Sequence, residues 1–311
     1  MTANRLETRP IEKVWGRHDL PRAFAAPALD GEPVGEIWFE DPRGGDAELL
    51  VKYLLTSEKL SIQVHPDGEM ARARGYPRGK DEAWVIVAAE PGARIGLGLR
   101  RAVSKRELRA AALDGRIETL VDWREAQVGD VYFSPAGTIH ALGPGLTLIE
   151  VQQNIDLTYR LYDYGRPREL HLDEAIEAAQ PVPYTPPFAP YELSPGREIL
   201  VDSPAFVIER WTLPTGGRLA AREGRPVWMI PVSGGGVIDG QPLKAPTVWL
   251  IEDQSRLRID PGSEILFAYP GQGVREELFV DTRVATASRG FRERRNFVPA
   301  VQLPPAFVPL L

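Results

Sequence analysis

Short apolar runs recur along the chain, separated by clusters of glycine and proline. Runs rich in Val, Ile, Leu and aromatic residues between such turn residues are typical of β-strands. The sequence contains 29 glycines and 29 prolines, and many short strands with this punctuation indicate a sandwich or barrel. In the first half the pattern predicts strands at 34–39, 49–55, 60–64, 83–88, 93–97, 130–133 and 146–152.

Three short helices are predicted among these strands. Asp67 is a suitable N-cap for a helix over 67–74. Ser104 and Glu107 have the spacing of a capping box, which predicts a helix from there to about Leu113. A third helix over 172–179 ends where a proline-rich segment begins.

A segment of ten residues, 181–190, holds five prolines and predicts extended connecting chain. We therefore expect two domains, 1–183 and 184–311. In the second domain, Asp239-Gly240 predicts a hairpin turn and Gly234-Gly235-Gly236 a further turn. Its last 35 or so residues form a tail with no regular pattern, where Arg289, Arg292, Arg294 and Arg295 predict a solvated basic face. The second-half strands are expected at 206–212, 227–232, 237–238, 247–251, 256–259 and 265–269.

Composition narrows the functional classes. The 311-residue chain has a net charge of −6, which gives no reason to expect nucleic acid or an anionic membrane as a partner. Cysteine is absent, so disulfides, thiolate metal sites and cysteine nucleophiles are excluded. The N-terminal residues lack the form of a signal peptide, and no apolar run approaches the about 18–20 residues that span a bilayer. We expect a cytoplasmic protein, and its oligomeric state is left open.

Four side chains are candidate metal ligands: Gln63, His65, Glu82 and His140. Gln63 and His65 are two residues apart, so on a strand they point to the same face. Imidazole, carboxylate and amide oxygen suit Zn, Mn, Co, Ni or Fe. The alternative is that Gln63 and His65 face solvent from an edge strand. The remaining histidines, His18 and His171, lack ligand-spaced neighbours and are expected at the surface.

The surrounding pattern resembles the two motifs of cupins. Gly129, Pro135, Gly137 and His140 have the spacing of the second motif, although Pro144 stands where asparagine is usual. Gln63-x-His65 followed by Glu82 is similar to the first motif, with Gln in place of its first His. The resemblance implies a mainly β fold of two cupin-like jelly-roll barrels with a few short helices. The N-terminal barrel would be catalytic, and the second, which has no histidine, would lack the metal site.

Several segments resemble the mannose-6-phosphate isomerase (phosphomannose isomerase) family in its compact bacterial form. They extend over roughly residues 11–166. Gly16-Arg17 and Asp67-Gly68 depart from the family pattern without touching a candidate ligand. The segments are Glu12-Lys13-Val14-Trp15-Gly16, Gly35-Glu36-Ile37-Trp38, Leu60-Ser61-Ile62-Gln63-Val64-His65-Pro66, Gly79-Lys80-Asp81-Glu82 and residues 150–160.

The resemblance implies a metal-dependent isomerase that interconverts mannose 6-phosphate and fructose 6-phosphate through an enediol(ate). It assigns Gln63, His65, Glu82 and His140 to one zinc ion, and it places Arg160 beside the hexose phosphate. Glu150 follows an apolar run, where burial would raise its pKa towards that of a base. Its alternative is a strand-end carboxylate paired with an arginine.

Further residues near these motifs are candidates for the substrate site. Lys80 and Ser61 resemble family positions near the substrate and suit a phosphate, although Lys80 also fits a surface turn. Asp156 would orient Arg160 or cap a turn, and Arg166 is a further phosphate candidate. Two other functions remain open: a cupin enzyme acting on a different sugar or sugar phosphate, and a non-catalytic sugar-sensing cupin.

Overall fold

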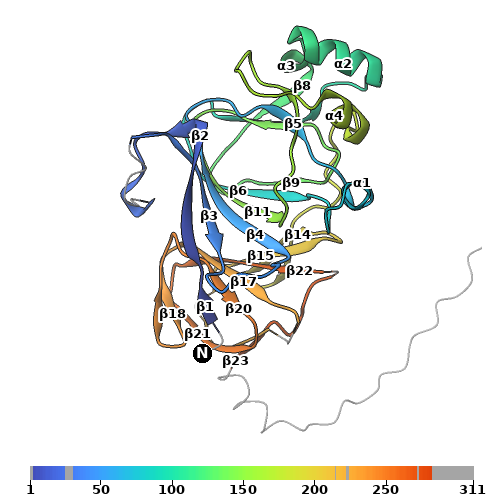
Figure 1. Cartoon of the computed structure of the whole chain (residues 1–311). Helices are drawn as coiled ribbons and strands as arrows, with labels where there is room; N and C mark the ends of the chain where they lie inside the picture. Colours follow the sequence, from blue (N-terminus) through green and yellow to red (C-terminus); the bar gives the residue numbers. More distant parts are fainter. Residues whose placement is uncertain (1–2, 25–30, 214, 222–223, 272, 282–311) are drawn as a thin grey trace, which may run out of the picture.

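The fold is mainly β-sheet, and every helix of the described residues precedes residue 180 (Figure 1). It is described from a computed structural model that places residues 3–24, 31–213, 215–221, 224–271 and 273–281. The basic cluster of the tail, Arg289 to Arg295, lies outside these residues. The helices are α1 (Gly68–Ala73), α2 (Lys105–Asp114), α3 (Ile117–Leu120) and α4 (Leu172–Ala178), with a 3-10 turn at Arg22–Phe24.

Twenty-three strands are found in the described residues. The first half supplies β1 (Ala3–Arg5), β2 (Glu7–Arg17), β3 (Val34–Glu40), β4 (Leu49–Leu55), β5 (Ile62–Val64), β6 (Glu82–Ala89), β7 (Arg94–Leu99), β8 (Val121–Glu125), β9 (Val131–Ser134), β10 (His140–Leu142), β11 (Leu146–Gln153) and β12 (Tyr159–Tyr162). The second half supplies β13 (Tyr191–Ser194), β14 (Arg197–Asp202), β15 (Phe206–Trp211), β16 (Thr215–Ala220), β17 (Val227–Ser233), β18 (Gly236–Ile238), β19 (Gln241–Leu243), β20 (Trp249–Ile251), β21 (Gln254–Ile259), β22 (Glu264–Pro270) and β23 (Phe279–Asp281).

These strands form four open antiparallel sheets. We name them sheets I to IV in the order in which they stack. Sheet I has the strand order β12-β5-β10-β7-β8, and sheet II has the order β2-β3-β4-β11-β6-β9. Sheet III has the order β1-β20-β17-β22-β15-β14-β13, and sheet IV has the order β19-β18-β21-β16-β23.

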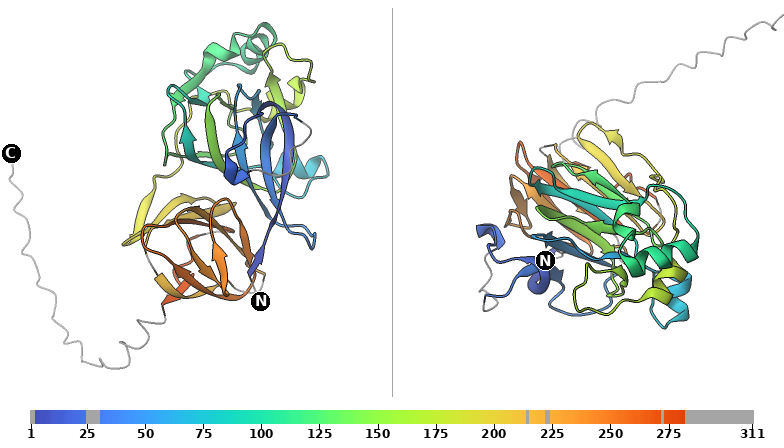
Figure 2. Two further views of the ribbon diagram at one scale, coloured as in Figure 1. Left: turned by 90° about the vertical axis from the view of Figure 1, so that its left-hand side faces the viewer. Right: turned by 90° about the horizontal axis from the view of Figure 1, so that it is seen from above.

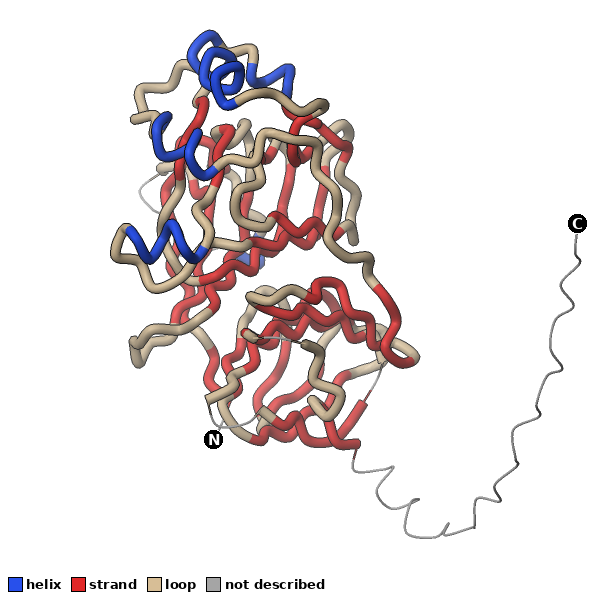
Figure 3. The backbone as a smooth tube through the Cα atoms, turned by 90° about the vertical axis from the view of Figure 1, so that its right-hand side faces the viewer, coloured by secondary structure: helices blue, strands red, loops and turns tan. Residues whose placement is uncertain are grey.

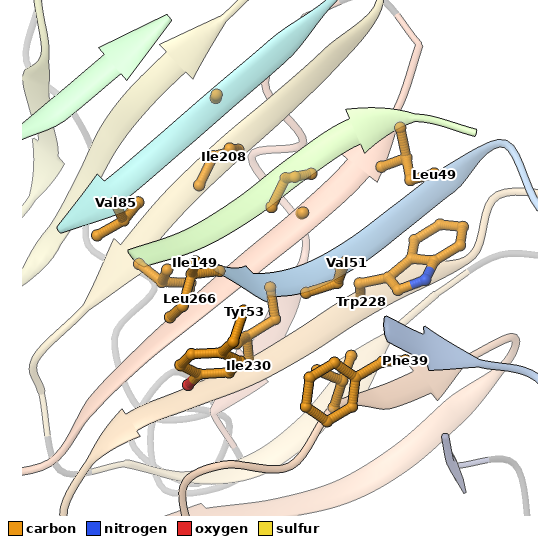
Figure 4. Packing of buried hydrophobic residues seen from close by; sticks show 14 of the residues in the cluster. Phe39, Leu49, Val51, Tyr53, Val85, Ile149, Ile208, Trp228, Ile230 and Leu266 are labelled. Carbon is orange, nitrogen blue, oxygen red and sulfur yellow. The ribbon is translucent and has the colours of Figure 1, made fainter. Parts of the chain in front are cut away.

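The stacking follows from which faces of the strands are apolar. In β6, Trp84 and Ile86 pack on Leu97 and Leu142 of sheet I, whereas Val85 between them points the other way, as the two-residue period of a strand requires. Residues of the second kind form the core between sheets II and III, where Tyr53, Val85 and Ile149 meet Ile208, Trp228 and Leu266 (Figure 4). A third core, with Phe267 and Leu257, joins sheets III and IV.

The helices α2, α3 and α4 gather at the end of the molecule away from the N-terminus, whereas α1 lies lower at its side (Figures 1 and 3). Leu108 of α2 and Ile176 of α4 pack on Ile62 and Val64, whose side chains point outward from sheet I. Successive side chains of a strand point to opposite faces. The residues of β5 and β10 that alternate with these outward ones therefore point inward, between sheets I and II. That inner space holds the candidate site.

The predicted apolar strands and capped helices are found. The Asp67 carboxylate accepts a hydrogen bond from the backbone of Met70, and the Ser104 hydroxyl accepts one from Glu107. Asp239 and Gly240, with φ of 46° and 82°, form the turn of the β18–β19 hairpin as predicted. Several of the strands that the sequence analysis missed are polar or very short, such as β2, β8, β10 and β12.

The first strand of the chain belongs to a sheet that the second half otherwise forms. β1 pairs with β20, so residues 3–5 belong to sheet III, whose other strands all follow residue 190 (Figure 2). A division into domains 1–183 and 184–311 stays a prediction. Among the described residues, no helix has the length and apolar character that crossing a membrane demands.

Candidate metal centre

Three of the four predicted ligands converge between sheets I and II. His65 directly follows β5 and His140 begins β10, both in sheet I, whereas Glu82 begins β6 in sheet II. All three are buried, and one potential ligand atom from each lies within 4.8 Å of the others. His140 pairs with Gln63 in the sheet register, so the fourth predicted ligand is next to this group.

Backbone carbonyls fix both imidazole rings. Nδ1 of His65 lies 3.0 Å from the carbonyl oxygen of Leu157, and Nδ1 of His140 lies 2.9 Å from that of Thr138. A carbonyl only accepts hydrogen bonds, so Nδ1 carries the proton and the lone pair is on Nε2. The Nε2 atoms of His65 and His140 lie 3.2 and 3.5 Å from carboxylate oxygens of Glu82.

The Nε2 atom of His65 is a buried polar atom without a hydrogen-bond partner. A neutral imidazole facing a carboxylate cannot donate from this nitrogen, so two acceptors are left in contact. Such an arrangement is costly unless a cation lies between them. The centre therefore fits a divalent metal held by two imidazole nitrogens and a carboxylate, with Nδ1 bonds that orient the rings.

The protonation states agree with this interpretation. Burial lowers the pKa of His65 to about 3 and also lowers the pKa of His140, so both rings are neutral at neutral pH. Burial acts to raise the pKa of Glu82, but the imidazoles when protonated and the Lys80 ammonium hold it well below its usual range. Two neutral imidazoles and a carboxylate are ready to ligate without losing protons.

Gln63 contacts the centre through its amide. Its Nε2 lies 3.2 Å from Nε2 of His140, and its Oε1 accepts a hydrogen bond of 3.0 Å from the Ser61 hydroxyl. The two ends of an amide are exchanged by a half-turn about the last side-chain bond, which would bring the oxygen to the centre. Gln63 is placed to be a ligand, and that role stays a prediction.

Backbone contacts tie the two motif segments together. The N–H of Gly137 donates to the carbonyl of His65 over 2.9 Å, and its φ of 86° suits glycine. The Asp81 carboxylate accepts a hydrogen bond of 2.8 Å from the N–H of Ala136. The turn before His140 is therefore bonded both to the segment carrying His65 and to the one carrying Glu82.

A cavity of about 150 Å³ adjoins the centre between sheets I and II. Seven of the eight predicted site residues line it, and the eighth, His65, reaches the same place through Glu82. The lining residues with polar or charged side chains are Lys13, Glu36, Lys52, Ser61, Gln63, Lys80, Glu82, His140, Glu150, Asp156, Thr158, Arg160 and Arg168.

Glu150 lies in the interior of β11, in register with Trp84 on one side and Lys52 on the other. Its Oε1 accepts a hydrogen bond of 2.9 Å from the Trp84 indole, and its Oε2 is 3.1 Å from the Lys52 ammonium. The alternative of a strand-end carboxylate paired with an arginine is therefore wrong. Burial raises the pKa of Glu150, and the charge of Lys52 offsets this only in part.

Lys52 and Glu36 are cavity residues that the sequence analysis missed. Lys52 is buried, and it also donates to Gln152 over 2.6 Å and lies 3.8 Å from Glu36. Burial acts to lower the pKa of Lys52, but the charges of Glu150, Glu36 and Glu82 raise it. The sequence did hold a signal for Lys52: it is the one charged residue of the strand Leu49–Leu55, whose other residues are aliphatic or tyrosine.

Lys80 and Ser61 are buried beside the centre. The Lys80 ammonium is 3.1 Å from Glu82, and the side chain is not the surface lysine of the alternative reading. The Arg160 guanidinium donates to the backbone carbonyl of Glu169 over 2.7 Å rather than to Asp156, although Asp156 also lines the cavity. Burial lowers the pKa of Arg160, and the charge of Arg168 adds to this.

The other candidates lie away from the cavity. Arg166 pairs with Glu58 over 2.6 Å and donates to the carbonyl of Lys59, and it does not line the cavity. His18 is exposed. His171 is half-buried, and its Nδ1 accepts a hydrogen bond from the backbone of Arg160 over 3.2 Å.

Comparison with known proteins relates the chain to mannose-6-phosphate isomerases. The chain is 32% identical over 273 residues to a mannose-6-phosphate isomerase of Streptococcus mutans serotype c, covering 74% of this chain and 84% of that protein. It is 32% identical over 219 residues to the mannose-6-phosphate isomerase ManA of Bacillus subtilis, covering 65% and 68% of the two chains. No protein-family model matches.

Solved structures agree with the sequence relatives. A crystal structure of mannose 6-phosphate isomerase from Bacillus subtilis superposes with a TM-score of 0.72 at 27% identity, covering 86% of this chain and 99% of that one. The apo form of mannose 6-phosphate isomerase from Salmonella typhimurium shares the fold, with a TM-score of 0.66 at 15% identity. The match covers 87% of this chain and 100% of that one. The extent and identity of the Streptococcus mutans match show that this chain belongs to the mannose-6-phosphate isomerase family.

Proposed function

We propose that the protein interconverts mannose 6-phosphate and fructose 6-phosphate, using one bound zinc ion. One observation carries this proposal: Nε2 of His65, Nε2 of His140 and the Glu82 carboxylate converge beside a cavity that also contains the buried Glu150. The activity named for the Streptococcus mutans relative, which matches over 84% of its length, supports the choice of substrate.

His65, Glu82 and His140 would hold the metal, with Gln63 as a fourth ligand once its amide oxygen faces the centre. Nitrogen and oxygen donors of this kind suit zinc, and a site with few protein ligands leaves room for oxygen atoms of water or substrate. When bound, the metal supplies Lewis-acid stabilisation of negative charge on a substrate oxygen. Ser61, which donates to Gln63, would help to orient that amide and border the substrate.

Glu150 is the proposed base. Its carboxylate takes the proton from C2 of the aldose, and the C2–H electron pair forms the C1–C2 double bond of an enediolate while C1–O takes up the negative charge. The hydroxyl proton on O2 then moves to O1, and return of the carbon proton from Glu150 to C1 leaves the C2=O group of the ketose, so atoms and charge balance. Trp84 and Lys52 each contact one carboxylate oxygen, and they would hold the base in place between the two transfers.

Two cationic side chains would stabilise charge on the substrate. Lys80, already 3.1 Å from Glu82, would donate to a substrate oxygen near C1 and C2. Arg160 lines the same cavity, and its Nε is buried without a hydrogen-bond partner, so it has a donor to offer a ligand. A guanidinium is permanently charged and forked, which suits an oxyanion.

We further propose that sheets I and II form a catalytic cupin-like barrel within residues 1–183, and that sheets III and IV form a second one from residues 184–311 together with β1. All four histidines of the sequence precede residue 172, so the second half offers no equivalent metal centre. The extensive core between sheets II and III supports a structural role for the second half.

A coupled assay of the zinc-loaded protein tests the proposal against its alternatives. Formation of fructose 6-phosphate from mannose 6-phosphate, faster than turnover of glucose 6-phosphate or unphosphorylated mannose, is expected. Turnover of a different sugar phosphate alone would favour another cupin enzyme. Binding of mannose 6-phosphate without turnover of any of these sugars would favour a sugar-sensing protein.

A further inference from the structure

A second cavity lies between sheets II and III, at one end of the core that joins them. Its volume is about 250 Å³, which is below the about 300–1,000 Å³ of pockets for drug-sized ligands and suits one or two side chains. Phe39 and Leu49 of sheet II and Trp228 of sheet III meet there (Figure 4). We call this cavity the seam pocket, and its large apolar lining residues are Leu6, Phe39, Leu49, Leu50, Trp228 and Leu250.

The indole of Trp228 lines the seam pocket with an unused hydrogen-bond donor. Trp228 is 2% exposed, and its N–H has no acceptor among the described residues. Trp84, Trp211 and Trp249 are also buried, and each donates to a side-chain oxygen. A buried indole N–H without an acceptor is unfavourable, so the pocket favours an apolar ligand that also carries a carbonyl oxygen.

The opening of the seam pocket is formed by the loop between β3 and β4. Gly44 and Gly45 are exposed, line the pocket and carry no side chain that would close it. The loop itself is fixed, because the Asn154 side chain donates to the Ala47 carbonyl over 2.9 Å and the Asn154 N–H donates to the Glu48 carbonyl over 2.9 Å. A firm rim of glycines lets the backbone of a bound segment approach closely.

The rim of the seam pocket carries an excess of negative charge. Asp41 lines the pocket, and it shares the guanidinium of Arg43 with Glu252. Glu7 and Glu48 each adjoin a lining residue and have no ion-pair partner within the part of the chain that the structure describes. A cationic segment beside the pocket would therefore be attracted to this rim.

The chain itself contains a segment of complementary character. Residues 282–311 lie outside the described residues, and their sequence has two parts. The first part holds the basic cluster of Arg289, Arg292, Arg294 and Arg295. The second part, 297–311, has Gln302 as its only polar residue and contains four prolines.

The composition of 297–311 favours docking in a groove. Apolar side chains are unfavourable in water, and proline lacks the N–H that helices and sheet interiors use. Proline-rich segments instead present side chains and carbonyl oxygens along an extended chain, and they bind in aromatic-lined grooves. The seam pocket offers them apolar walls and the free N–H of Trp228.

The seam pocket is within reach of this segment. Asp281, the last described residue, ends β23 in sheet IV, and 16 residues separate it from residue 298. Sixteen residues of extended chain span up to about 50 Å. Packed sheets are about 10 Å apart, so this length is ample to pass sheet III and reach the pocket on its other side.

We propose that the seam pocket binds the proline-rich part of the chain's own tail, residues 297–309. The Trp228 N–H donates to a carbonyl oxygen of this segment, and the tail arginines lie beside the acidic rim. The bound segment holds sheets II and III together across the seam. This inference is independent of the proposed function, because the seam pocket and the cavity at the metal centre share no lining residue.

A disulfide between two introduced cysteines tests the docking, because the chain has no cysteine of its own. In the full chain, Ala47→Cys in the pocket wall is combined with Ala300→Cys or with Ala306→Cys in the tail. The matched control combines the same tail cysteine with Ala110→Cys, at an exposed position of α2. The rate of disulfide formation under mild oxidation is followed by non-reducing electrophoresis, which separates links within one chain from links between two.

At least one pair that includes Ala47→Cys should form its disulfide about tenfold or more faster than its Ala110→Cys control. Docking raises the effective concentration of the tail cysteine at the pocket, whereas an undocked tail meets both positions at similar rates. Equal rates for both tail positions would overturn the inference. A disulfide that forms only between two chains would overturn the assignment to the chain's own tail.

Two further changes in the fastest cysteine pair test the contacts. Trp228→Phe should slow disulfide formation about threefold to tenfold, as for loss of one hydrogen bond. Its control, Trp249→Phe, removes an indole that donates to Thr247 in the core between sheets III and IV, and it should stay within about twofold. Tm shows whether each variant folds.

A change in the tail decides the question if Trp228→Phe does not fold. Arg292→Glu with Arg295→Glu leaves every described residue intact, and it should slow disulfide formation about threefold or more at low salt. The effect should shrink at high salt, because the attraction to the acidic rim is screened. A rate that none of these changes alters would overturn the inference.

Discussion

The ammonium of Lys52 lies 3.1 Å from the Oε2 atom of Glu150, with both side chains buried on adjacent strands of sheet II. The pair connects the proposed base to the structural framework, because Lys52 also contacts Gln152 and lies over the Trp38 ring. A carboxylate at this position would otherwise be an uncompensated buried charge. The pair therefore bears on both activity and stability.

Replacing Glu150 with Gln should abolish proton transfer while preserving the site. The amide keeps an acceptor for the Trp84 indole but cannot take a proton from carbon. We expect kcat to fall about 10²–10⁴-fold, the usual contribution of a positioned acid–base group. Zinc content, measured on the same sample, should equal that of the wild type. A variant with wild-type kcat would show that another group is the base.

Replacing Lys52 with Met should destabilise the protein. It leaves Glu150 and Glu36 without their buried ammonium, and loss of one partner from a buried pair costs about 3–5 kcal/mol. Denaturant unfolding of zinc-loaded protein measures this change. The double variant Lys52→Met with Glu150→Gln should recover part of the loss, because the unpaired charge is gone. Additive destabilisation by the two substitutions would contradict an interaction between them.

The raised pKa of Glu150 predicts where activity is lost on acidification. A base works only when deprotonated, so kcat/KM should fall as pH drops through its pKa. Burial raises that pKa, so the midpoint of the acid limb should lie above the ordinary glutamate value of about 4.3. Zinc content followed over the same pH range excludes metal loss as the cause. A midpoint at or below the ordinary value would contradict the assignment.

The raised pKa of Glu150 also predicts how stability depends on pH, and this dependence is opposite to that of activity. A carboxyl group whose folded-state pKa is raised favours folding most while it is protonated, below its unfolded pKa. This contribution is lost as pH rises through the folded-state pKa. Glu150 is therefore expected to cost folding free energy at the pH where the enzyme is active, which is typical of a group kept for function.

A second buried ion pair, between sheets III and IV, should affect stability alone. Glu209 accepts hydrogen bonds of 2.6 and 2.8 Å from Arg197 and one of 2.6 Å from the Tyr269 hydroxyl. Glu209→Gln should lower the free energy of unfolding by about 3–5 kcal/mol, because Arg197 keeps its buried charge. Zinc content and kcat of the folded protein should stay at wild-type values.

The control for Glu209 is Asp260→Asn, which breaks an exposed pair with Arg258. Exposed pairs contribute at most about 1 kcal/mol, so this change should be small. A loss of zinc in Glu209→Gln would show that the second half supports the metal centre more directly than the structure indicates.

The apolar strands could be predicted from the sequence because both of their faces are buried or half-buried. Each therefore appears as a nearly continuous apolar run. The sequence also allowed the convergence of His65, Glu82 and His140 to be predicted, because these residues lie within motifs whose turn residues are recognisable. Helix caps at Asp67 and Ser104 are local hydrogen bonds between neighbours in the chain, so they too were accessible.

What the sequence did not reveal are relationships set by strand order and register. Lys52 and Glu150 are far apart in the chain and meet only because β4 and β11 pair in one register. β1 pairs with β20, at the other end of the chain, which no local pattern indicates. Arg168 is one of several arginines after β12. Both Arg166 and Arg168 contact Asp163, and the position of Arg168 in the cavity wall distinguishes it from Arg166.

The central claim is that the converging histidines and Glu82 hold a metal that the reaction requires. The most direct test is the metal content of the purified protein together with the rate of fructose 6-phosphate formation from mannose 6-phosphate. The wild type, His140→Ala and the exposed-histidine control His18→Ala are compared. About one metal ion per chain with turnover, both lost in His140→Ala and both kept in His18→Ala, is the predicted result. Undiminished turnover by a His140→Ala protein that binds no metal would contradict the account.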